Sequence, residues 1–139
     1  MAPTSAHQYL DMEIKDDMQY DIRIENARID SGEFHSASDE NDTLTTDDVE
    51  DLMIRHNGGT RHVCSSGEEE GFKGLQGTID LVDDVRDARI CTLAWNAPME
   101  PGKRNLLMMH HHDPQYNVEI GKWNESGVMG TVPITISNQ

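Results

Sequence analysis

The sequence predicts an all-β protein, folded as a single-domain antiparallel β-sandwich over residues 1–139. Short runs in which apolar and polar residues alternate recur along the chain, as expected of strands with one face in water. Turn-forming residues separate these runs at short intervals. No apolar period of 3.6 residues persists beyond a couple of helical turns. Many short strands with frequent turns in one small chain are typical of a sandwich.

The first half of the chain contains two alternating runs and a turn signal. Residues 8–14, "QYLDMEI", and 20–29, "YDIRIENARI", read as strands, and in the second Tyr20, Ile22 and Ile24 share a face. Residues 51–64, "DLMIRHNGGTRHVC", place Asn57-Gly58 between two strand-like runs. Asn-Gly in that position predicts a β-hairpin.

Five further strands are predicted at residues 77–82, 89–95, 104–110, 116–120 and 130–136. Between the second and third of them, "AWNAPMEPGK" contains two prolines, which cannot continue a ladder, so this segment is expected to be a loop. The loop would present Trp95, Met99 and Lys103 near one edge. Trp95 is equally compatible with the core, because it stands on a strand. Trp123, in a polar stretch, is expected to be partly exposed.

The acidic segment 39–51, "DENDTLTTDDVED", is predicted to be an exposed loop, because its concentration of carboxylates resists packing. Its oxygen-bearing side chains approach the spacing of an EF-hand calcium loop. The sixth position, however, is Leu44, where the sharp turn requires glycine, and neither flank reads as a helix. We therefore interpret the segment as a solvated loop and expect no cofactor there.

The histidine run His110–His112 and the cysteines Cys64 and Cys91 were considered as sites of chemistry. A strand would place His110 and His112 on one face with Asp113 nearby. A tight zinc or copper site requires three or four converging ligands, so these residues do not predict one. The two cysteines could pair, but two reduced, half-buried thiols are the default interpretation. No nucleophile elbow, C-x-x-C, H-E-x-x-H or phosphate loop occurs. The sequence therefore predicts that the protein is not an enzyme and that no metal site is present.

The charge balance restricts the partners. The chain has 26 acidic and 11 basic residues, a net charge of -15, which disfavours nucleic acid and anionic lipid headgroups. A membrane partner should present a neutral or zwitterionic headgroup, or a protein receptor. No apolar run approaches the roughly 20 residues needed to span a bilayer, and residues 1–17 lack the basic start and apolar core of a signal peptide. We expect a protein made in soluble form without a signal peptide.

Several motifs, in order, resemble the aegerolysin family of small acidic β-sandwich proteins. Residues 77–84, "GTIDLVDD", match the family run G-T-F-D-L-V-D, and 93–103, "LAWNAPMEPGK", stand where members have Y-W-D-C-P-W-G-S. Residues 116–136, "YNVEIGKWNESGVMGTVPITI", are similar to W-x-I-E-Y followed by G-x-L-G-T-I-T-V. Upstream, "HVCSSGEEEGFKG" and "AHQYLDMEI" resemble the segment around I-N-A-S-G and a first strand opening Q-W. The resemblance covers most of the chain and implies an aegerolysin-like or actinoporin-like fold.

The resemblance also implies a function. Aegerolysins bind membranes, often through sphingolipids, and many are the targeting half of a two-component pore-forming toxin whose larger partner carries a membrane-attack-complex/perforin domain. Some bacterial members form insecticidal pairs, so insect gut cells are the expected target. We expect this chain to act outside the cell that makes it, at the target-cell membrane, and a homo-oligomer is compatible with this function.

The departures from the family pattern fall in the expected contact regions. Trp95-Asn96-Ala97-Pro98-Met99 loses a cysteine and a tryptophan of the family loop, and Tyr9 and Tyr116 replace tryptophans. Lys73-Gly74 stands where sphingolipid-binding members have an acidic residue before glycine. We hypothesise that these regions form one edge that contacts a membrane or receptor. The histidines His110–His112 would lie beside this edge, so that their protonation would make binding depend on pH. The proposed membrane- or receptor-binding residues of the edge are Tyr9, Lys73, Trp95, Met99, Lys103, Tyr116 and Trp123.

Two other functions remain open at this point. One is a lipid- or glycan-binding module that acts without a pore-forming partner. The other is a small metal-binding protein that uses the acidic segment or the histidine run.

Overall fold

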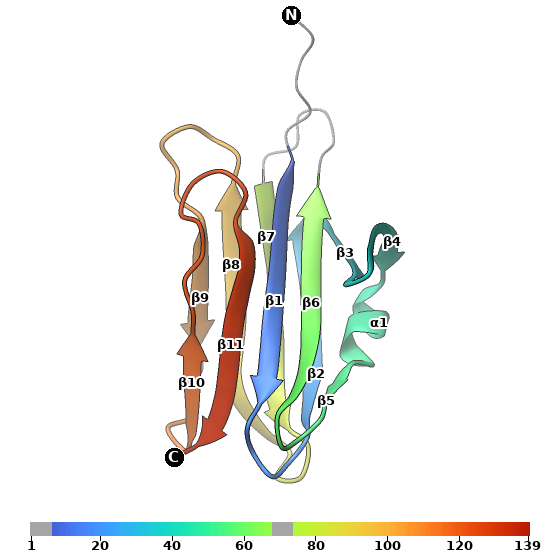
Figure 1. Cartoon of the computed structure of the whole chain (residues 1–139), viewed down its shortest axis with the longest axis vertical. Helices are drawn as coiled ribbons and strands as arrows, with labels where there is room; N and C mark the ends of the chain where they lie inside the picture. The colour runs from blue at the N-terminus through green and yellow to red at the C-terminus, as the bar shows by residue number, and fades with distance from the viewer. Residues whose placement is uncertain (1–6, 68–73) are drawn as a thin grey trace, which may run out of the picture.

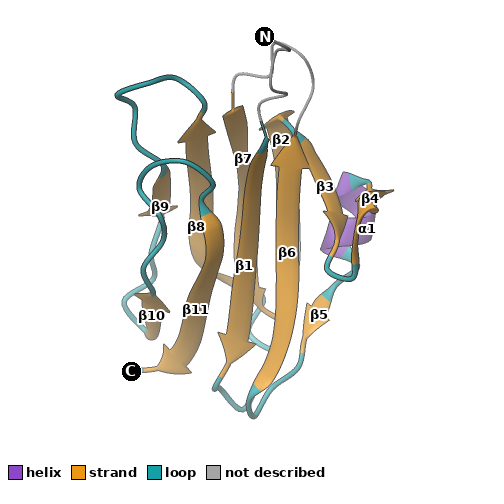
Figure 2. Cartoon of the chain, turned by 45° about the horizontal axis from the view of Figure 1, so that its top comes forward, coloured by secondary structure: helices purple, strands orange, loops and turns teal. Residues whose placement is uncertain are grey.

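Two β-sheets stack face to face in a computed structural model that describes residues 7–67 and 74–139 (Figures 1 and 2). Lys73 lies outside the described residues. The elements are β1 (Gln8–Asp16), β2 (Ile22–Ser31), β3 (Glu33–Ser36), β4 (Asp39–Leu44), α1 (Thr46–Glu50), β5 (Met53–Ile54), β6 (Gly59–Gly67), β7 (Gly74–Asp83), β8 (Ala88–Pro98), β9 (Leu106–His110), β10 (Tyr116–Ile120) and β11 (Gly130–Asn138). The predicted β-sandwich is confirmed.

Sheet A has the strand order β10-β11-β1-β6-β3-β4, and sheet B has the order β5-β2-β7-β8-β9. The prediction of an antiparallel arrangement needs one correction, because β1 and β11 pair in parallel from Leu10↔Gly130 to Asp16↔Ile136. These are the first and last described strands, so no local connection has to join them. Their pairing places the first and last described strands side by side in sheet A (Figure 1).

The core lies between the sheets, and alternate residues of β1 show how a strand contributes to it. Leu10, Met12 and Ile14 of β1 are fully buried, while the residues between them face the outside of sheet A. Trp95 of β8 occupies the centre of the opposite sheet, with its ring centroid 6.0 Å from that of Phe34. Gly77 on the neighbouring strand leaves room for the indole, since a Cβ there would come within 2.5 Å of the ring.

The predicted turn at Asn57-Gly58 is present, but the predicted hairpin is wrong. Both residues have positive φ, 58° and 96°, which suits Asn and Gly. The backbone amides of Asn57 and Gly58 donate to the carbonyls of Met18 and Asp16 at 2.9 and 2.6 Å. However, β5 pairs with β2 in sheet B, whereas β6 pairs with β1 and β3 in sheet A. The turn therefore connects the two sheets.

The acidic segment 39–51 is ordered, which corrects the prediction of a loop. It forms β4, whose Leu44 pairs with Phe34, and then the five-residue helix α1. A reciprocal capping box begins the helix: the Thr45 hydroxyl accepts from the Asp48 amide at 3.1 Å, and the Asp48 carboxylate accepts from the Thr45 amide at 2.9 Å. Val49 is buried beneath the helix, so a single apolar anchor and a cap compensate for the exposed carboxylates.

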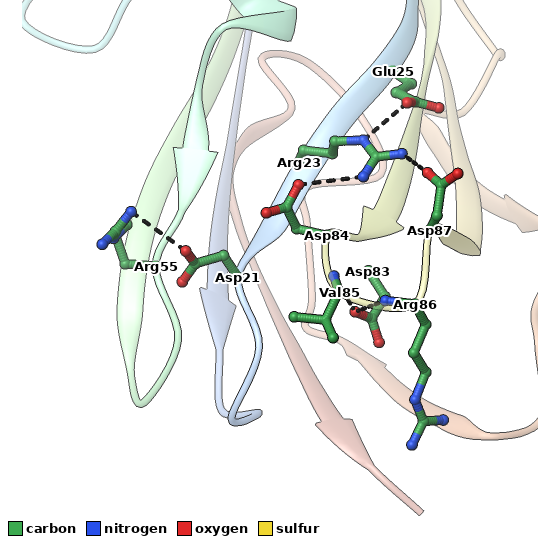
Figure 3. Close-up of polar contacts among 9 residues, drawn as sticks. All are labelled: Asp21, Arg23, Glu25, Arg55, Asp83, Asp84, Val85, Arg86 and Asp87. Atoms are coloured by element: carbon green, nitrogen blue, oxygen red, sulfur yellow. Dashed lines mark hydrogen bonds and ion pairs between the residues drawn. The ribbon is translucent and has the colours of Figure 1, made fainter.

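Acidic residues also organise the end of the sandwich that carries the turns 17–21, 55–58 and 84–87, here called the turn end (Figure 3). The buried Asp83 carboxylate accepts from the amides of Val85 and Arg86 at 3.0 and 3.1 Å, which fixes the turn between β7 and β8. Arg23 crosses the same turn, with ion pairs to Asp84 at 3.2 Å and to Asp87. Val85 stands at the tip of this turn with 66% of its surface exposed.

Candidate functional site

Two long loops lie next to each other at the opposite end of the sandwich (Figures 1 and 2). Residues 99–105 connect β8 to β9, and residues 121–129 connect β10 to β11. The Asn105 amide donates to the Glu125 carbonyl at 2.8 Å, which joins one loop to the other. We call these two loops, with the first residue of β1, the loop end.

A buried amide pair locks the loop end to the sandwich. The Gln8 side-chain amide donates to Asn105 Oδ1 at 3.3 Å and to the Gly127 carbonyl at 3.0 Å, and its oxygen accepts from the Met129 amide at 2.7 Å. The Asn105 side chain donates to the carbonyls of Asn124 and Gly127 at 2.9 and 3.0 Å. Gln8 and Asn105 are buried. A satisfied buried network of this kind holds loops in one conformation.

Trp123 completes the attachment of the second loop. Its indole Nε1 donates to the Asn105 carbonyl at 2.8 Å, and its ring packs against the core while remaining half-buried. The prediction that Trp123 is partly exposed is therefore confirmed. An indole with an anchored N–H and a partly exposed ring is suited to a surface contact.

The outer surface of the loop end combines apolar side chains with cations and with Glu100, which lines the same hollow as Lys103. Met99 and Lys103 line a hollow of about 250 Å³ that the second loop closes with Ser126 and Gly127. Val128 is 42% exposed in that second loop.

Three exposed cations belong to the loop end. Arg104 pairs with Glu125 at 3.5 Å, while Lys103 and Lys122 have no ion pair within residues 7–67 and 74–139. Exposed cations of this kind are uncommon in a chain of net charge -15. The turn end, in contrast, is held by paired acids (Figure 3).

The structure removes two residues from the predicted contact edge. Trp95 is 1% exposed because the inner face of β8 carries it into the core. Tyr116 is equally buried, and its hydroxyl donates to Asp83 Oδ2 at 2.7 Å near the turn end. Burial, with the hydrogen bond to Asp83, raises the pKa of Tyr116 to about 12. The prediction that Trp95 and Tyr116 contact a membrane is therefore wrong for this folded form.

Tyr9 belongs to the outer face of sheet A. Its ring lies 5.6 Å from that of His35, and its neighbours include Cys64 and Asp11. Burial, with the nearby thiol and carboxylate, raises the pKa of Tyr9 to about 12. Because Tyr9 follows Gln8 directly, it flanks the loop end and is separate from the hollow that contains Met99 and Lys103.

Two details of the predicted loop and histidine run are corrected. Pro98 is the last residue of β8 and pairs with Gly74, so the loop begins only at Met99; β9 pairs with β8 no further than Asn96, which leaves the proline on an unpaired side. The histidines lie away from the loop end, because β9 runs from Leu106 beside the loops to His110 at the far end.

The histidine run also does not continue the strand. His111 has a φ of 54°, and His112 donates to the Tyr116 carbonyl at 2.6 Å. His110 and His112 therefore do not present a shared strand face, and the histidines do not lie beside the loop that contains Met99 and Lys103, as the hypothesis expected. Across the described part of the chain, no group of three or more His, Cys, Asp or Glu side chains is placed to hold a metal ion.

Both cysteines are free and buried, and burial raises the pKa of each thiol to about 12. The expectation of half-buried thiols is therefore wrong, because each side chain is enclosed by the packed sheet that carries it. Among the residues that the structure describes, no helix has the length and apolar character to cross a bilayer.

Sequence reasoning missed Gln8, Asn105 and Val128. The family-like opening Gln8-Tyr9 was a usable signal for Gln8, because a polar side chain on the inward face of a strand needs a hydrogen-bond partner. Asn105 belongs to no recognisable motif. Val128 could not be identified because its exposure depends on the conformation of the loop.

The fold defines a two-sheet β-sandwich protein, and two long loops joined by hydrogen bonds lie at one end of it. The chain belongs to the aegerolysin family, whose family model matches residues 7–139. Members of this family bind membrane lipids, and its lipid-binding members are not enzymes.

Individual relatives agree with this assignment. Terrelysin from Aspergillus terreus is 33% identical over 133 residues, which cover 94% of this chain and 88% of terrelysin. The crystal structure of the RahU protein in complex with a TRIS molecule is similar in fold, with a TM-score of 0.85 and 20% identity over 95% of this chain and 96% of RahU. The structure of IP-1A from Alcaligenes faecalis gives a TM-score of 0.81 and 20% identity over 98% and 94% of the two chains.

Proposed function

We propose that this aegerolysin is the lipid- or receptor-binding subunit of a two-component pore-forming toxin. It acts outside the producing cell, on the target-cell membrane, together with a protein that carries a membrane-attack-complex/perforin domain. The subunit supplies attachment, and the partner supplies the membrane-spanning part. Attachment concentrates the partner at the membrane and favours its assembly by effective concentration. A sphingolipid is the first candidate ligand, and insect gut cells are the first candidate target.

The observation that carries the proposal is the locked loop end. Gln8 and Asn105 hold both loops in place, so the exposed side chains need little further ordering on binding. The first loop presents Met99 with Lys103 and Glu100, and the second loop exposes Val128; apolar and charged side chains together suit the boundary between zwitterionic headgroups and acyl chains. The rest of the described surface is dominated by carboxylates, which anionic headgroups repel.

The proposed contact set follows from this geometry. It consists of Met99, Lys103, Trp123 and Val128 at the loop end. Tyr9 flanks this surface, and Lys73, outside the described residues, is kept as a proposed contributor because it directly precedes Gly74, the first residue of β7 at the same end.

Sedimentation with lipid vesicles tests the contact surface. Val128→Asp places a carboxylate at the loop end. It should weaken binding to sphingolipid-containing vesicles by roughly tenfold or more, because the carboxylate would have to lose its water on entering the membrane surface. Val85→Asp is the matched control, since the same change is made at an exposed valine of the turn end. Equal binding by the two variants would reject the loop end as the contact surface.

Vesicle permeabilisation separates the two-component toxin from a module that acts alone. The protein by itself should bind vesicles without releasing a trapped dye, and dye release should require the perforin-like partner. Release by this chain alone at low concentration would contradict the proposal. Binding that never leads to release with any perforin-like partner would favour a lipid- or glycan-binding module.

A further inference from the structure

Strand β9 has an edge that lacks the usual protection against pairing. It pairs with β8 on one side, and no strand of the described chain pairs with its other side. Leu107 and Met109 face the core, while Leu106 and Met108 are 45% and 36% exposed on the outer face of sheet B. The run Leu106–Met109 contains no charge and no proline. Edge strands that do not pair with another chain usually carry a charged residue or a proline that prevents such pairing.

The distribution of charge indicates what can approach this edge. Residues 101–112 contain no aspartate or glutamate, although the chain has 26 acidic residues. The one acidic side chain paired with this stretch, Glu125, is neutralised by Arg104 at 3.5 Å. Two copies of a protein with net charge -15 repel each other over most of their surfaces. The β9 edge is where a second copy meets the least repulsion, whereas a cationic partner would be drawn to the acidic remainder.

We propose that two copies of the chain associate through β9, paired antiparallel about a two-fold axis. The whole strand β9, Leu106–His110, aligns with itself when Met108 faces Met108 of the second copy. Leu106 then lies opposite His110, and Leu107 lies opposite Met109. The free N–H and C=O groups of the edge become paired, and sheet B continues from one copy into the other. The exposed Leu106 and Met108 side chains become cross-strand neighbours.

The association should be weak and concentration-dependent, because β9 has five residues and the interface is smaller than the roughly 800 Å² per partner of stable complexes. In this arrangement the two loop ends point in opposite directions. Self-association is therefore separate from the proposed membrane contact, and it is tested in solution without lipid.

Analytical ultracentrifugation of the wild-type chain over a range of concentrations should show a monomer–dimer equilibrium. Met108→Lys should raise the dimer dissociation constant by roughly tenfold or more, because like charges would then face each other across the axis. Val85→Lys, which adds the same charge at the turn end, should leave the dimer unchanged. A monomer at every concentration would overturn the proposal, and so would a dimer that Met108→Lys does not weaken.

Cross-linking provides a second measurement that needs no loss of structure. Met108→Cys places a reactive thiol on the axis, whereas the native Cys64 and Cys91 are buried. A short bismaleimide should convert this variant into covalent dimers, and the yield should fall on dilution. Val85→Cys, whose thiol is more exposed, should give few covalent dimers. Equal yields from the two variants would show that the contact is random and would overturn the pairing through β9.

Discussion

The hydroxyl of Tyr116 donates to Asp83 Oδ2 across the two sheets at 2.7 Å, and both residues are buried. Tyr116 begins β10 at the edge of sheet A, while Asp83 ends β7 in the interior of sheet B. The same carboxylate holds the turn between β7 and β8 through its other oxygen. One side chain therefore fixes both a turn and the spacing of the sheets.

Tyr116→Phe should lower the free energy of unfolding by about 1–3 kcal/mol, since it leaves one oxygen of a buried carboxylate without its donor. Urea denaturation followed by fluorescence measures the change. Tyr20→Phe is the matched control, because Tyr20 is half-buried and its hydroxyl donates to no described residue. A loss no larger than that of the control would mean that water replaces the lost donor.

Trp95→Ala should destabilise the protein by about 3–5 kcal/mol, because it opens a cavity in the centre of the core beside Phe34. Any loss of membrane binding should follow the unfolded fraction and should disappear under conditions where the variant is folded. Val85→Ala, at an exposed position, should change stability by less than about 0.5 kcal/mol. A folded Trp95→Ala protein that fails to bind vesicles would restore the indole to the contact surface.

Most strands were predictable because alternation is a local property of the sequence, whereas β3 and the acidic β4 were not predicted. Each predicted run overlaps an observed strand, and the buried faces of β1 and β2 follow the pattern directly. The pairing of those strands was not predictable in the same way. The Asn57-Gly58 turn has the dihedral angles of a hairpin turn, yet its flanking strands belong to different sheets, and only long-range contacts decide that.

The sequence predicted which loop forms the candidate site, but it did not predict correctly which residues belong to the site. The loop around Met99 and Lys103 was identified from its prolines and its family-like residues. Trp95 stands four residues earlier on the same segment, and the direction of its side chain depends on the register of β8 with β7. Asn105 could not be identified from the sequence, because its role depends on a hydrogen bond with Gln8, which is 97 residues away in the chain.

Asp16 should make stability depend on pH. Its Oδ1 accepts from the Met18 amide at 2.8 Å, while Oδ2 is buried without a partner among the described residues. Burial, aided by the nearby Asp21 and Asp83, raises the pKa of Asp16 from its ordinary 3.8 to about 7. Between these values the folded chain keeps a proton that the unfolded chain has released. Stability should therefore fall as pH rises from about 4 to about 7.

The difference between the wild type and Asp16→Asn isolates this effect, because all other carboxyl groups are shared. The variant should gain stability relative to the wild type by up to about 1.4 kcal/mol for each pH unit across that window, and by nothing further above it. Urea titrations at a series of pH values measure the gain. Asp17→Asn is the control, since Asp17 is exposed and pairs with Lys15 at 3.6 Å. Parallel pH profiles for the wild type and Asp16→Asn would show that Asp16 is ionised throughout.

Asn105→Ala should release the loop end without unfolding the sandwich. The substitution removes the donors to the carbonyls of Asn124 and Gly127 and the acceptor for Gln8, so buried polar groups lose partners at a cost of about 1–3 kcal/mol. That cost falls on the loops, because the strands keep their ladders. Hydrogen exchange should accelerate at the Met129 amide, which donates to Gln8, and across residues 121–129.

The matched control for this change is Asn117→Ala, which removes a 3.3 Å bond to the Asn138 carbonyl at the other end of the same strand pair. Exchange in residues 121–129 should be unchanged in that variant. If the loop end contacts lipid, Asn105→Ala should also weaken vesicle binding, because the loops would have to be ordered on contact. Faster exchange with undiminished binding would show that the loops are rigid in the free protein but that their rigidity contributes nothing to recognition.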